Sequence, residues 1–352
     1  MRTLPRALLA LALVLLLATG ARAAERLPAL GVDLAATSVS GISSGAYMAG
    51  QFQLAFSADV VGAGIVAGGP WGCAVSGWSS WGLPTFGGAV NAGRALTRCM
   101  ATTGGEPDGS ELARRAIRYA ERGRIDPIEN LARQRIYLFH GEGDSVVARP
   151  VVLAAAELYR ALGVPKANLR TVLKLETGRA GHALIVDSHG SECGANASPF
   201  IADCGYDQAA AILSWIYPDF RRERDTPKGR LLVFDQTEFL PGAVGFGLAR
   251  EGVAYVPPSC AATPGCRVHI AFHGCLQSRT LDEVGDRFVE DAGYLRYADA
   301  NRLVLLFPQT NANTAPNACW DWWGYASSDV LSQRAPQLAA TRAMLARLGE
   351  TP

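Results

Sequence analysis

Residues 38–48, Ser-Val-Ser-Gly-Ile-Ser-Ser-Gly-Ala-Tyr-Met, form the stretch that decides the fold of this chain. Its apolar start predicts a short buried strand, and the run that continues through Phe52 predicts a helix. A Gly-x-Ser-x-Gly pattern joins the two. Gly41 and Gly45 suit a turn so sharp that larger side chains would collide, and such a turn presents Ser43 as a candidate nucleophile.

A neighbouring hydroxyl, Ser44, is the alternative nucleophile, but only Ser43 occupies the centre of the turn. The pattern can also arise by chance in a chain with 38 glycines. A serine that attacks an ester needs a histidine as its base and a carboxylate that orients the histidine. The assignment therefore depends on finding these partners elsewhere in the chain.

Predicted strands and helices alternate along the first half of the chain. Such alternation is typical of a parallel sheet with helices on both faces. Ser110 is the expected N-cap of one helix, and the Gly- and Trp-rich segment 71–105 is interpreted as a loop or lid. The expected strands are 36–40, 60–67, 135–140 and 169–173, and the expected helices are 110–122 and 150–162.

Asp144 and His182 each follow the end of an expected strand, as Ser43 does. Loops at the carboxyl ends of parallel strands meet at one edge of the sheet. The chain order serine, aspartate, histidine is the one that α/β-hydrolases use. These coincident placements predict a catalytic triad of Ser43, Asp144 and His182.

Three other aspartates, Asp187, Asp203 and Asp207, are available near His182. They follow the histidine in the chain, which is the wrong order for the acid of such a triad. We expect them to be surface or capping residues.

Four histidines compete with His182 for the role of base. His140 and His273 lie in His-Gly steps at strand ends, where a structural hydrogen bond is expected, and His269 is interpreted as a core residue of a strand. His189, in a loop, is the most serious rival. The setting of His182 directly after a strand favours His182.

The second half of the chain contains a strong strand that begins at Arg267 and ends in His273-Gly274-Cys275. In an ordinary α/β-hydrolase the His-Gly loop that supplies an oxyanion-hole amide precedes the nucleophile. Here it follows Ser43 by about 230 residues, which predicts a circular permutation. The predicted fold is therefore α/β, a circularly permuted α/β-hydrolase fold with a mostly parallel central sheet flanked by helices, and residues 24–352 are expected to form one domain.

Residues 1–23 predict a secretory signal peptide, because Arg2 and Arg6 precede an apolar run that ends in an A-x-A site at Ala23. Its removal takes away three arginines and leaves 30 basic residues against 32 acidic ones, a formal charge of −2. Near-neutrality argues against a nucleic-acid partner, and no later run predicts a membrane span. An exported protein, extracellular or periplasmic, is expected, and its oligomeric state stays open.

The eight cysteines all follow the expected signal peptide, and an even number in an exported chain predicts disulfides rather than a metal site. Closeness in sequence favours two pairs, Cys193 with Cys204 and Cys260 with Cys266. By exclusion, the remaining pairs would be Cys73 with Cys99 and Cys275 with Cys319.

Three segments together resemble the extracellular poly(3-hydroxybutyrate) depolymerases, above all their single-domain, circularly permuted type. They are residues 40–49 at the sharp turn, Phe-His-Gly-Cys-Leu-Gln at 272–277 and Cys-Trp-Asp-Trp-Trp at 319–323. Carried over by position, the resemblance implies Ser43, Asp144 and His182 as the triad. It also implies the backbone N–H groups of Ser44 and Cys275 as the oxyanion hole.

The resemblance implies a serine esterase that hydrolyses poly(3-hydroxybutyrate) or its oligomers through an acyl-enzyme, without a metal or organic cofactor. Trp320, Trp322 and Trp323 are interpreted as a wall of the substrate site, against the alternative that they are core aromatics. A separate polymer-binding domain is not expected, which favours amorphous polymer or oligomers. A feruloyl or acetyl-xylan esterase is the nearest alternative. A non-catalytic binding protein on a hydrolase scaffold is a more distant one.

Overall fold

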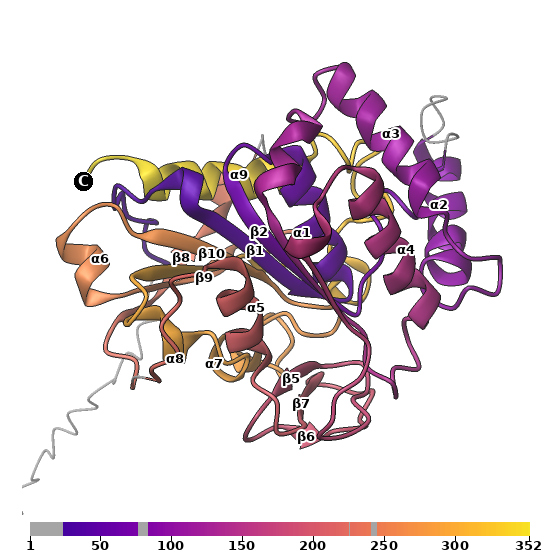
Figure 1. The fold of residues 1–352 in the computed structure, drawn as a ribbon. Coiled ribbons are helices and arrows are strands. Elements are labelled where there is room, and N and C mark those ends of the chain that lie inside the picture. The colour runs from indigo at the N-terminus through magenta and orange to yellow at the C-terminus, as the bar shows by residue number, and fades with distance from the viewer. Residues whose placement is uncertain (1–23, 77–83, 225, 241–244) are drawn as a thin grey trace, which may run out of the picture.

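The computed structural model describes residues 24–76, 84–224, 226–240 and 245–352. The expected signal peptide, Trp78 and Trp81 lie outside these residues. An eight-stranded sheet with the order β4-β3-β2-β1-β10-β11-β9-β8 forms the centre of the molecule (Figure 1). Its strands are β1 (Thr37–Ile42), β2 (Val60–Val66), β3 (Arg135–Phe139), β4 (Leu169–Val172), β8 (Arg230–Asp235), β9 (Glu251–Val256), β10 (Arg267–Phe272) and β11 (Leu303–Phe307).

The direction of the strands confirms a mostly parallel sheet. Strand β9 runs antiparallel to both of its neighbours, β8 and β11, and the other paired strands of this sheet are parallel. All residues of β1 are buried, as expected for a strand with helices on both faces.

The first strand of the sheet pairs with β2 on one side and with β10 on the other. In the pairing with β10, Val39 lies opposite Ile270. The carboxyl-terminal half of the chain therefore supplies the strands on one side of β1, and the amino-terminal half supplies those on the other. This is the arrangement that a circular permutation predicts.

Helices cover both faces of the sheet (Figure 1). One apolar cluster holds side chains of α1, α3, α4 and α9, and a second cluster on the opposite face holds side chains of α5, α7 and α8. The helices are α1 (Ser44–Ala55), α2 (Pro84–Arg98), α3 (Gly109–Glu121), α4 (Arg149–Ala161), α5 (Gln208–Ile216), α6 (Pro258–Ala262), α7 (Arg287–Asp291), α8 (Leu295–Ala298) and α9 (Pro336–Gly349). Short 3-10 turns lie at Leu34–Ala36, Ile128–Arg133, Lys166–Asn168, Gln236–Phe239 and Pro316–Ala318.

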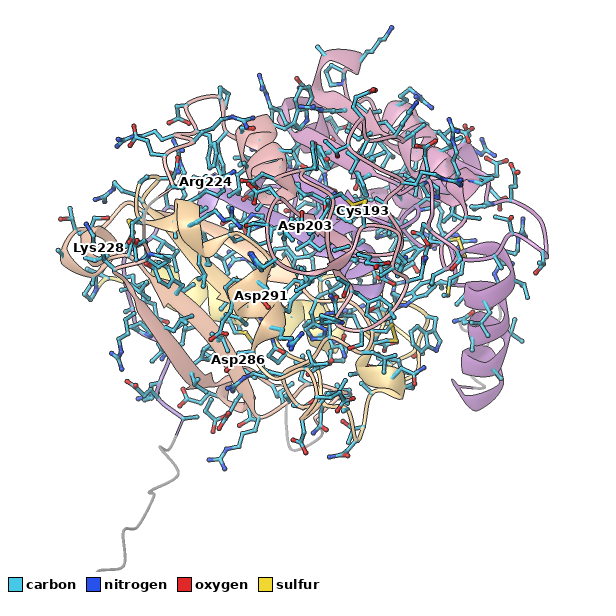
Figure 2. The ribbon with its side chains drawn as sticks, turned by 90° about the horizontal axis from the view of Figure 1, so that it is seen from below. Cys193, Asp203, Arg224, Lys228, Asp286 and Asp291 are labelled. Carbon is cyan, nitrogen blue, oxygen red and sulfur yellow. A yellow bond between two sulfur atoms is a disulfide. The ribbon has the colours of Figure 1, made fainter. Side chains whose placement is uncertain are left out.

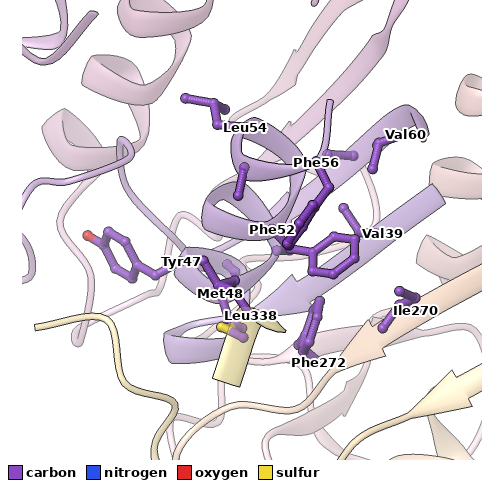
Figure 3. Packing of buried hydrophobic residues seen from close by; sticks show 14 of the residues in the cluster. Val39, Tyr47, Met48, Phe52, Leu54, Phe56, Val60, Ile270, Phe272 and Leu338 are labelled. Carbon is purple, nitrogen blue, oxygen red and sulfur yellow. The ribbon is translucent and has the colours of Figure 1, made fainter. Parts of the chain in front are cut away.

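Helix α1 is packed against the strands that carry the candidate site (Figure 3). Phe52 is fully buried, and its ring lies 6.3 Å from the ring of Phe272 at the end of β10. Val39 of β1 and Ile270 of β10 belong to the same cluster. Burial of a phenylalanine of this kind stabilises the fold by about 1.5–3 kcal/mol, so the start of α1 is held firmly over β1 and β10.

Two local predictions were wrong. Segment 71–105 contains helix α2, although it was interpreted as a loop or lid. The N-cap of α3 is Asp108, whose carboxylate accepts a hydrogen bond from the Glu111 N–H at 2.8 Å, whereas Ser110 donates to Glu157.

A small second sheet, which the sequence did not predict, has the order β5-β7-β6 and follows His182. Its strands are β5 (Leu184–Val186), β6 (Ser191–Glu192) and β7 (Ile201–Asp203).

The structure contains the four disulfides that the sequence predicted. They join Cys73 to Cys99, Cys193 to Cys204, Cys260 to Cys266, and Cys275 to Cys319. In the part of the chain that the structure describes, none of the helices has both the length and the apolar character needed to cross a bilayer.

Candidate active site

Ser43 lies at the turn between β1 and α1, with φ +56° and ψ −121°. A non-glycine residue with positive φ is strained, and such strain persists where the surroundings hold the backbone firmly. A Cβ on Gly41 would lie 2.2 Å from the Gly45 carbonyl oxygen, and one on Gly45 would lie 2.2 Å from the His273 carbonyl oxygen. Both glycines are therefore required, the second because the loop after β10 packs directly on the turn.

His182 donates to Asp144 at the carboxyl ends of neighbouring strands. The distance from His182 Nδ1 to Asp144 Oδ2 is 2.9 Å. The other carboxylate oxygen, Oδ1, accepts from the N–H groups of Val146 and Val147 at 2.8 and 2.9 Å. Because the carboxylate accepts, Nδ1 of His182 carries the hydrogen and Nε2 is left as a proton acceptor. This tautomer is the one that a general base requires.

Ser43 and His182 line the same cavity, which has a volume of about 370 Å³. Ser44 and Cys275, the expected sources of the oxyanion hole, line it as well. The walls are mostly apolar and include Tyr47, Leu96, Val147, Leu276, Trp322 and Trp323. The cavity therefore combines a serine and a histidine with space for an apolar acyl chain.

The peptide group between Gly274 and Cys275 is held by His273. Thr310 N–H donates to Nε2 of His273 at 3.3 Å, so Nδ1 carries the hydrogen and donates to the Gly274 carbonyl oxygen at 2.7 Å. Burial lowers the pKa of His273 to about 4, which keeps the ring neutral. In a trans peptide the N–H points opposite to the carbonyl, so the orientation of the Cys275 N–H is fixed by His273.

The three tryptophans of segment 319–323 have different positions. Trp322 stacks on Tyr47 with ring centroids 4.0 Å apart, Trp323 packs edge-on against Trp322, and both line the cavity. Trp320 does not line it, which corrects the prediction that this residue forms part of the wall. Its ring is fully buried, and its Nε1–H donates to the His273 carbonyl oxygen at 2.9 Å. Trp320 therefore supports the loop that carries Cys275.

Asp321 anchors the loop that carries Trp322 and Trp323. Its buried carboxylate accepts hydrogen bonds from four successive backbone N–H groups, those of residues 324–327, at 2.7 to 3.1 Å. Burial raises the pKa of Asp321 to about 6, although the four N–H groups act in the opposite direction. One wall of the cavity therefore depends on a carboxyl group that titrates above its usual range.

We expect the stability of the wild-type protein, relative to an Asp321→Asn variant, to fall as pH rises from about 4 to 7. The folded state holds the Asp321 proton more tightly than the unfolded state, so the stabilisation is present below the usual pKa of 3.8 and is lost as pH rises through about 6. The shift corresponds to about 3 kcal/mol. Urea unfolding of both proteins across this range measures it, and a difference independent of pH would contradict the prediction.

The rival histidines lie elsewhere or have structural partners. His189 is exposed and its Nε2 lies 3.8 Å from Asp291, outside the cavity lining. His140 donates to the Val147 carbonyl oxygen, as expected for a structural role. His269 is fully buried between the hydroxyls of Ser38 and Ser40, at 2.7 and 2.8 Å. His182 is thus the histidine that shares both a cavity with Ser43 and a carboxylate partner.

The rival aspartates have the surface and capping roles that were expected. Asp187 pairs with Arg224 and Arg296, Asp203 accepts from the Gly205 N–H, and Asp207 caps α5. Among the described residues, no group of three or more His, Cys, Asp or Glu side chains is placed to hold a metal ion. Sequence reasoning did not single out Asn196, Phe200 or Gln277, which also line the cavity.

A strained serine after a central strand, a histidine–aspartate pair and a His-Gly-Cys loop on the neighbouring strand of a mostly parallel sheet define the chain as an α/β-hydrolase. No family model matches it. The chain is 34% identical to a polyhydroxybutyrate depolymerase of Talaromyces funiculosus over 338 residues, which are 90% of this chain and 91% of that protein. It is 40% identical over 340 residues to a poly(3-hydroxybutyrate) depolymerase of Delftia acidovorans, and this match covers 94% of the chain but 64% of the relative's length.

Two similar solved structures are also PHB depolymerases. The PHB depolymerase from Penicillium funiculosum, and a serine-to-alanine PHB depolymerase complexed with an R3HB trimer, each superpose with a TM-score of 0.78 and 30% sequence identity. Both comparisons cover 93% of this chain and 100% of the solved chain. The chain therefore belongs to the polyhydroxybutyrate depolymerase family.

Proposed function

We propose that this chain hydrolyses the ester bonds of poly(3-hydroxybutyrate) or its oligomers through an acyl-enzyme intermediate. The observation that carries the proposal is the position of Ser43. It lies at a strained turn, in an apolar cavity that also contains His182 in the tautomer of a general base. The known relatives add the substrate class, because those named above are depolymerases of this polyester.

In the first half of the reaction, Ser43 Oγ attacks the ester carbonyl carbon while His182 Nε2 takes the hydroxyl proton. The negative charge that forms on the carbonyl oxygen would be bound by the N–H groups of Ser44 and Cys275. Each such donor contributes about 3 kcal/mol in comparable sites. His182 then gives its proton to the leaving hydroxyl of the next monomer unit, and the acyl group stays on Ser43.

In the second half, water replaces the alcohol. His182 takes a proton from the water as it attacks the acyl carbon, and returns that proton to Ser43 Oγ as the acid product leaves. Asp144 would hold the imidazole and stabilise its cation through the bond at 2.9 Å. Every step uses residues of this chain and water.

We also propose that the protein is exported and that a signal peptide is cleaved near Ala23. The four disulfides support an oxidising compartment. Protein sequencing of the amino terminus of the exported protein tests the cleavage site.

The test of the function measures release of 3-hydroxybutyrate products from amorphous granules, crystalline film and short oligomers in parallel. Feruloyl and acetylated sugar esters serve as comparison substrates. Hydrolysis of hydroxybutyrate esters in preference to these is the expected result. A preference for feruloyl or acetyl esters would replace the proposal with another esterase, and absence of all esterase activity would favour a binding protein.

A further inference from the structure

One loop contacts three parts of the candidate site, the segments that carry Asp144, His182 and Cys275. We propose that loop 193–204, which the Cys193–Cys204 disulfide closes, is a clamp that holds the acid, base and oxyanion loops in their relative positions. Asn196 and Gln277 are its positioning residues. In Figure 2, the label of Cys193 marks one end of this loop, and the label of Asp203, the residue before Cys204, marks the other end. The inference deepens the proposed hydrolytic function and rests on it.

Asn196 joins the acid loop to the base loop. Its Oδ1 accepts from the His182 N–H at 2.8 Å and from the Ser145 N–H at 3.0 Å. Its Nδ2 donates to the carbonyl oxygens of Gly143 and Gly194 at 3.1 and 3.0 Å. These four bonds use the two donors and two acceptor sites of the amide. Three of them reach backbone groups on either side of Asp144 and at His182, and the fourth, to Gly194, stays within loop 193–204.

Gln277 joins the same loop to the oxyanion loop. Its Nε2 donates to the carbonyl oxygens of Pro199 and Phe200 at 2.7 and 3.2 Å. Its Oε1 accepts from the Gly274 N–H at 2.6 Å. Because the side chain is 1% exposed, water cannot readily take over these bonds if the loop moves. The position of the Cys275 peptide group is therefore tied to loop 193–204.

Two further contacts bring the loop against the base itself. The ring of Phe200 packs edge-on against the His182 ring, with centroids 6.0 Å apart. The Gly181 N–H donates to the Cys193 carbonyl oxygen at 2.8 Å, and a Cβ on Gly181 would lie 2.2 Å from the Ala195 carbonyl oxygen. Residues 181 and 182 are thus packed against both ends of loop 193–204.

The sheet alone does not fix these loops relative to one another. Asp144 follows β3 and Cys275 follows β10, and β2 and β1 lie between those strands. His182 lies outside the strands of this sheet, before β5. Catalytic groups need positions within about 0.5 Å of the productive geometry, and a misplacement of about 1 Å can lower the rate by about 100-fold. A short disulfide-closed loop that bonds to all three segments supplies this constraint.

The first experiment removes the disulfide. We compare Cys193→Ala/Cys204→Ala with a matched control, Cys260→Ala/Cys266→Ala. Both variants open a short loop: the two cysteines are 11 residues apart in the first disulfide and 6 residues apart in the control. We measure kcat and KM from the hydrolysis of p-nitrophenyl butyrate. The assay temperature lies well below the Tm of each protein. We expect the first variant to lose about 100-fold in kcat with KM nearly unchanged. The control should lose Tm and keep its kcat.

The second experiment changes Asn196 and leaves the disulfide intact. It therefore tests the clamp even if the variant without the disulfide does not fold. Asn196→Ala loses all four hydrogen bonds and should lower kcat by about 100-fold. Asn196→Asp keeps the two accepted bonds and should recover part of the loss. Asn168→Ala, at an exposed amide that donates to the Ala132 carbonyl oxygen, is the control.

The outcomes separate the clamp from the proposed function. If the wild-type protein hydrolyses no ester and a fluorophosphonate does not label Ser43, the proposed function fails and the clamp fails with it. If the wild-type protein is active and folded Asn196→Ala keeps its kcat within about threefold, the clamp is overturned and the function stands. A fall in kcat that the control disulfide variant shows equally would also overturn the clamp.

Discussion

Replacement of Ser43 by alanine is expected to lower kcat by about 10⁶-fold, since this is the loss seen when the nucleophile of a comparable triad is removed. The variant has no oxygen at the centre of the turn to attack the ester. Alanine has no larger volume than serine, so the turn and the core beneath it should be preserved. Ester hydrolysis in steady state measures the loss, and the Tm of the variant shows whether the fold is intact.

The matched control for this prediction is Ser44→Ala. Ser44 is expected to act through its backbone N–H, which alanine retains, and its hydroxyl accepts only a long bond of 3.4 Å from the Trp320 N–H. We therefore expect at most about a tenfold loss, together with full fluorophosphonate labelling. If Ser43→Ala kept near-normal activity, or if labelling moved to Ser44, the assignment of Ser43 would be wrong.

The positions of Ser43, Asp144 and Cys275 could be predicted from the sequence because each closely follows a strand of the central sheet, whereas β4 ends at Val172, well before His182. A Gly-x-Ser-x-Gly turn specifies its own geometry, and the close approaches at Gly41 and Gly45 explain why. Asp144 and His182 lie in the segments that follow the parallel strands β3 and β4, and such segments lie at one edge of the sheet. The pairing of β1 with β10 then brings the displaced His-Gly loop to the same place.

The roles of the tryptophans could not be predicted, because three aromatic residues in an irregular loop have no period that separates buried from exposed positions. Trp320 is buried and donates a hydrogen bond to the His273 carbonyl oxygen. Trp322 lines the cavity and stacks on Tyr47. Both contacts join segments distant in the sequence, so no local pattern indicates them.

Helix α2 was missed for a related reason. Its sequence, Pro-Thr-Phe-Gly-Gly-Ala-Val-Asn-Ala-Gly-Arg-Ala-Leu-Thr-Arg, contains three glycines, which lower helix propensity by about 1 kcal/mol each relative to alanine. Tertiary contacts compensate for this. Cys99, just after the helix, is joined to Cys73, and Asn91 within it accepts from the Ser76 N–H at 2.8 Å. The helix brings Leu96 to the cavity, so this error concerned a wall of the candidate site.

The second large effect is expected from Asp144→Asn, which should lower kcat by about 10⁴-fold, as the same change does in a comparable triad. Asparagine can still accept from the Val146 and Val147 N–H groups through its oxygen. Its NH₂ group then faces His182 Nδ1, which can accept only if the hydrogen moves to Nε2. A histidine in that tautomer cannot take the proton of Ser43, although every atom stays in place.

The argument depends on the tautomer rather than on stability, and two measurements separate them. The Tm of Asp144→Asn should stay close to that of the wild-type protein, because the variant keeps the bonds of the loop. Asp33→Asn, at an exposed carboxylate that accepts from the Ala35 N–H at 3.0 Å, should retain normal kcat. Activity of Asp144→Asn within about tenfold of the wild-type value, with the fold intact, would show that another acid orients His182, because a correctly assigned acid lowers kcat far more than this.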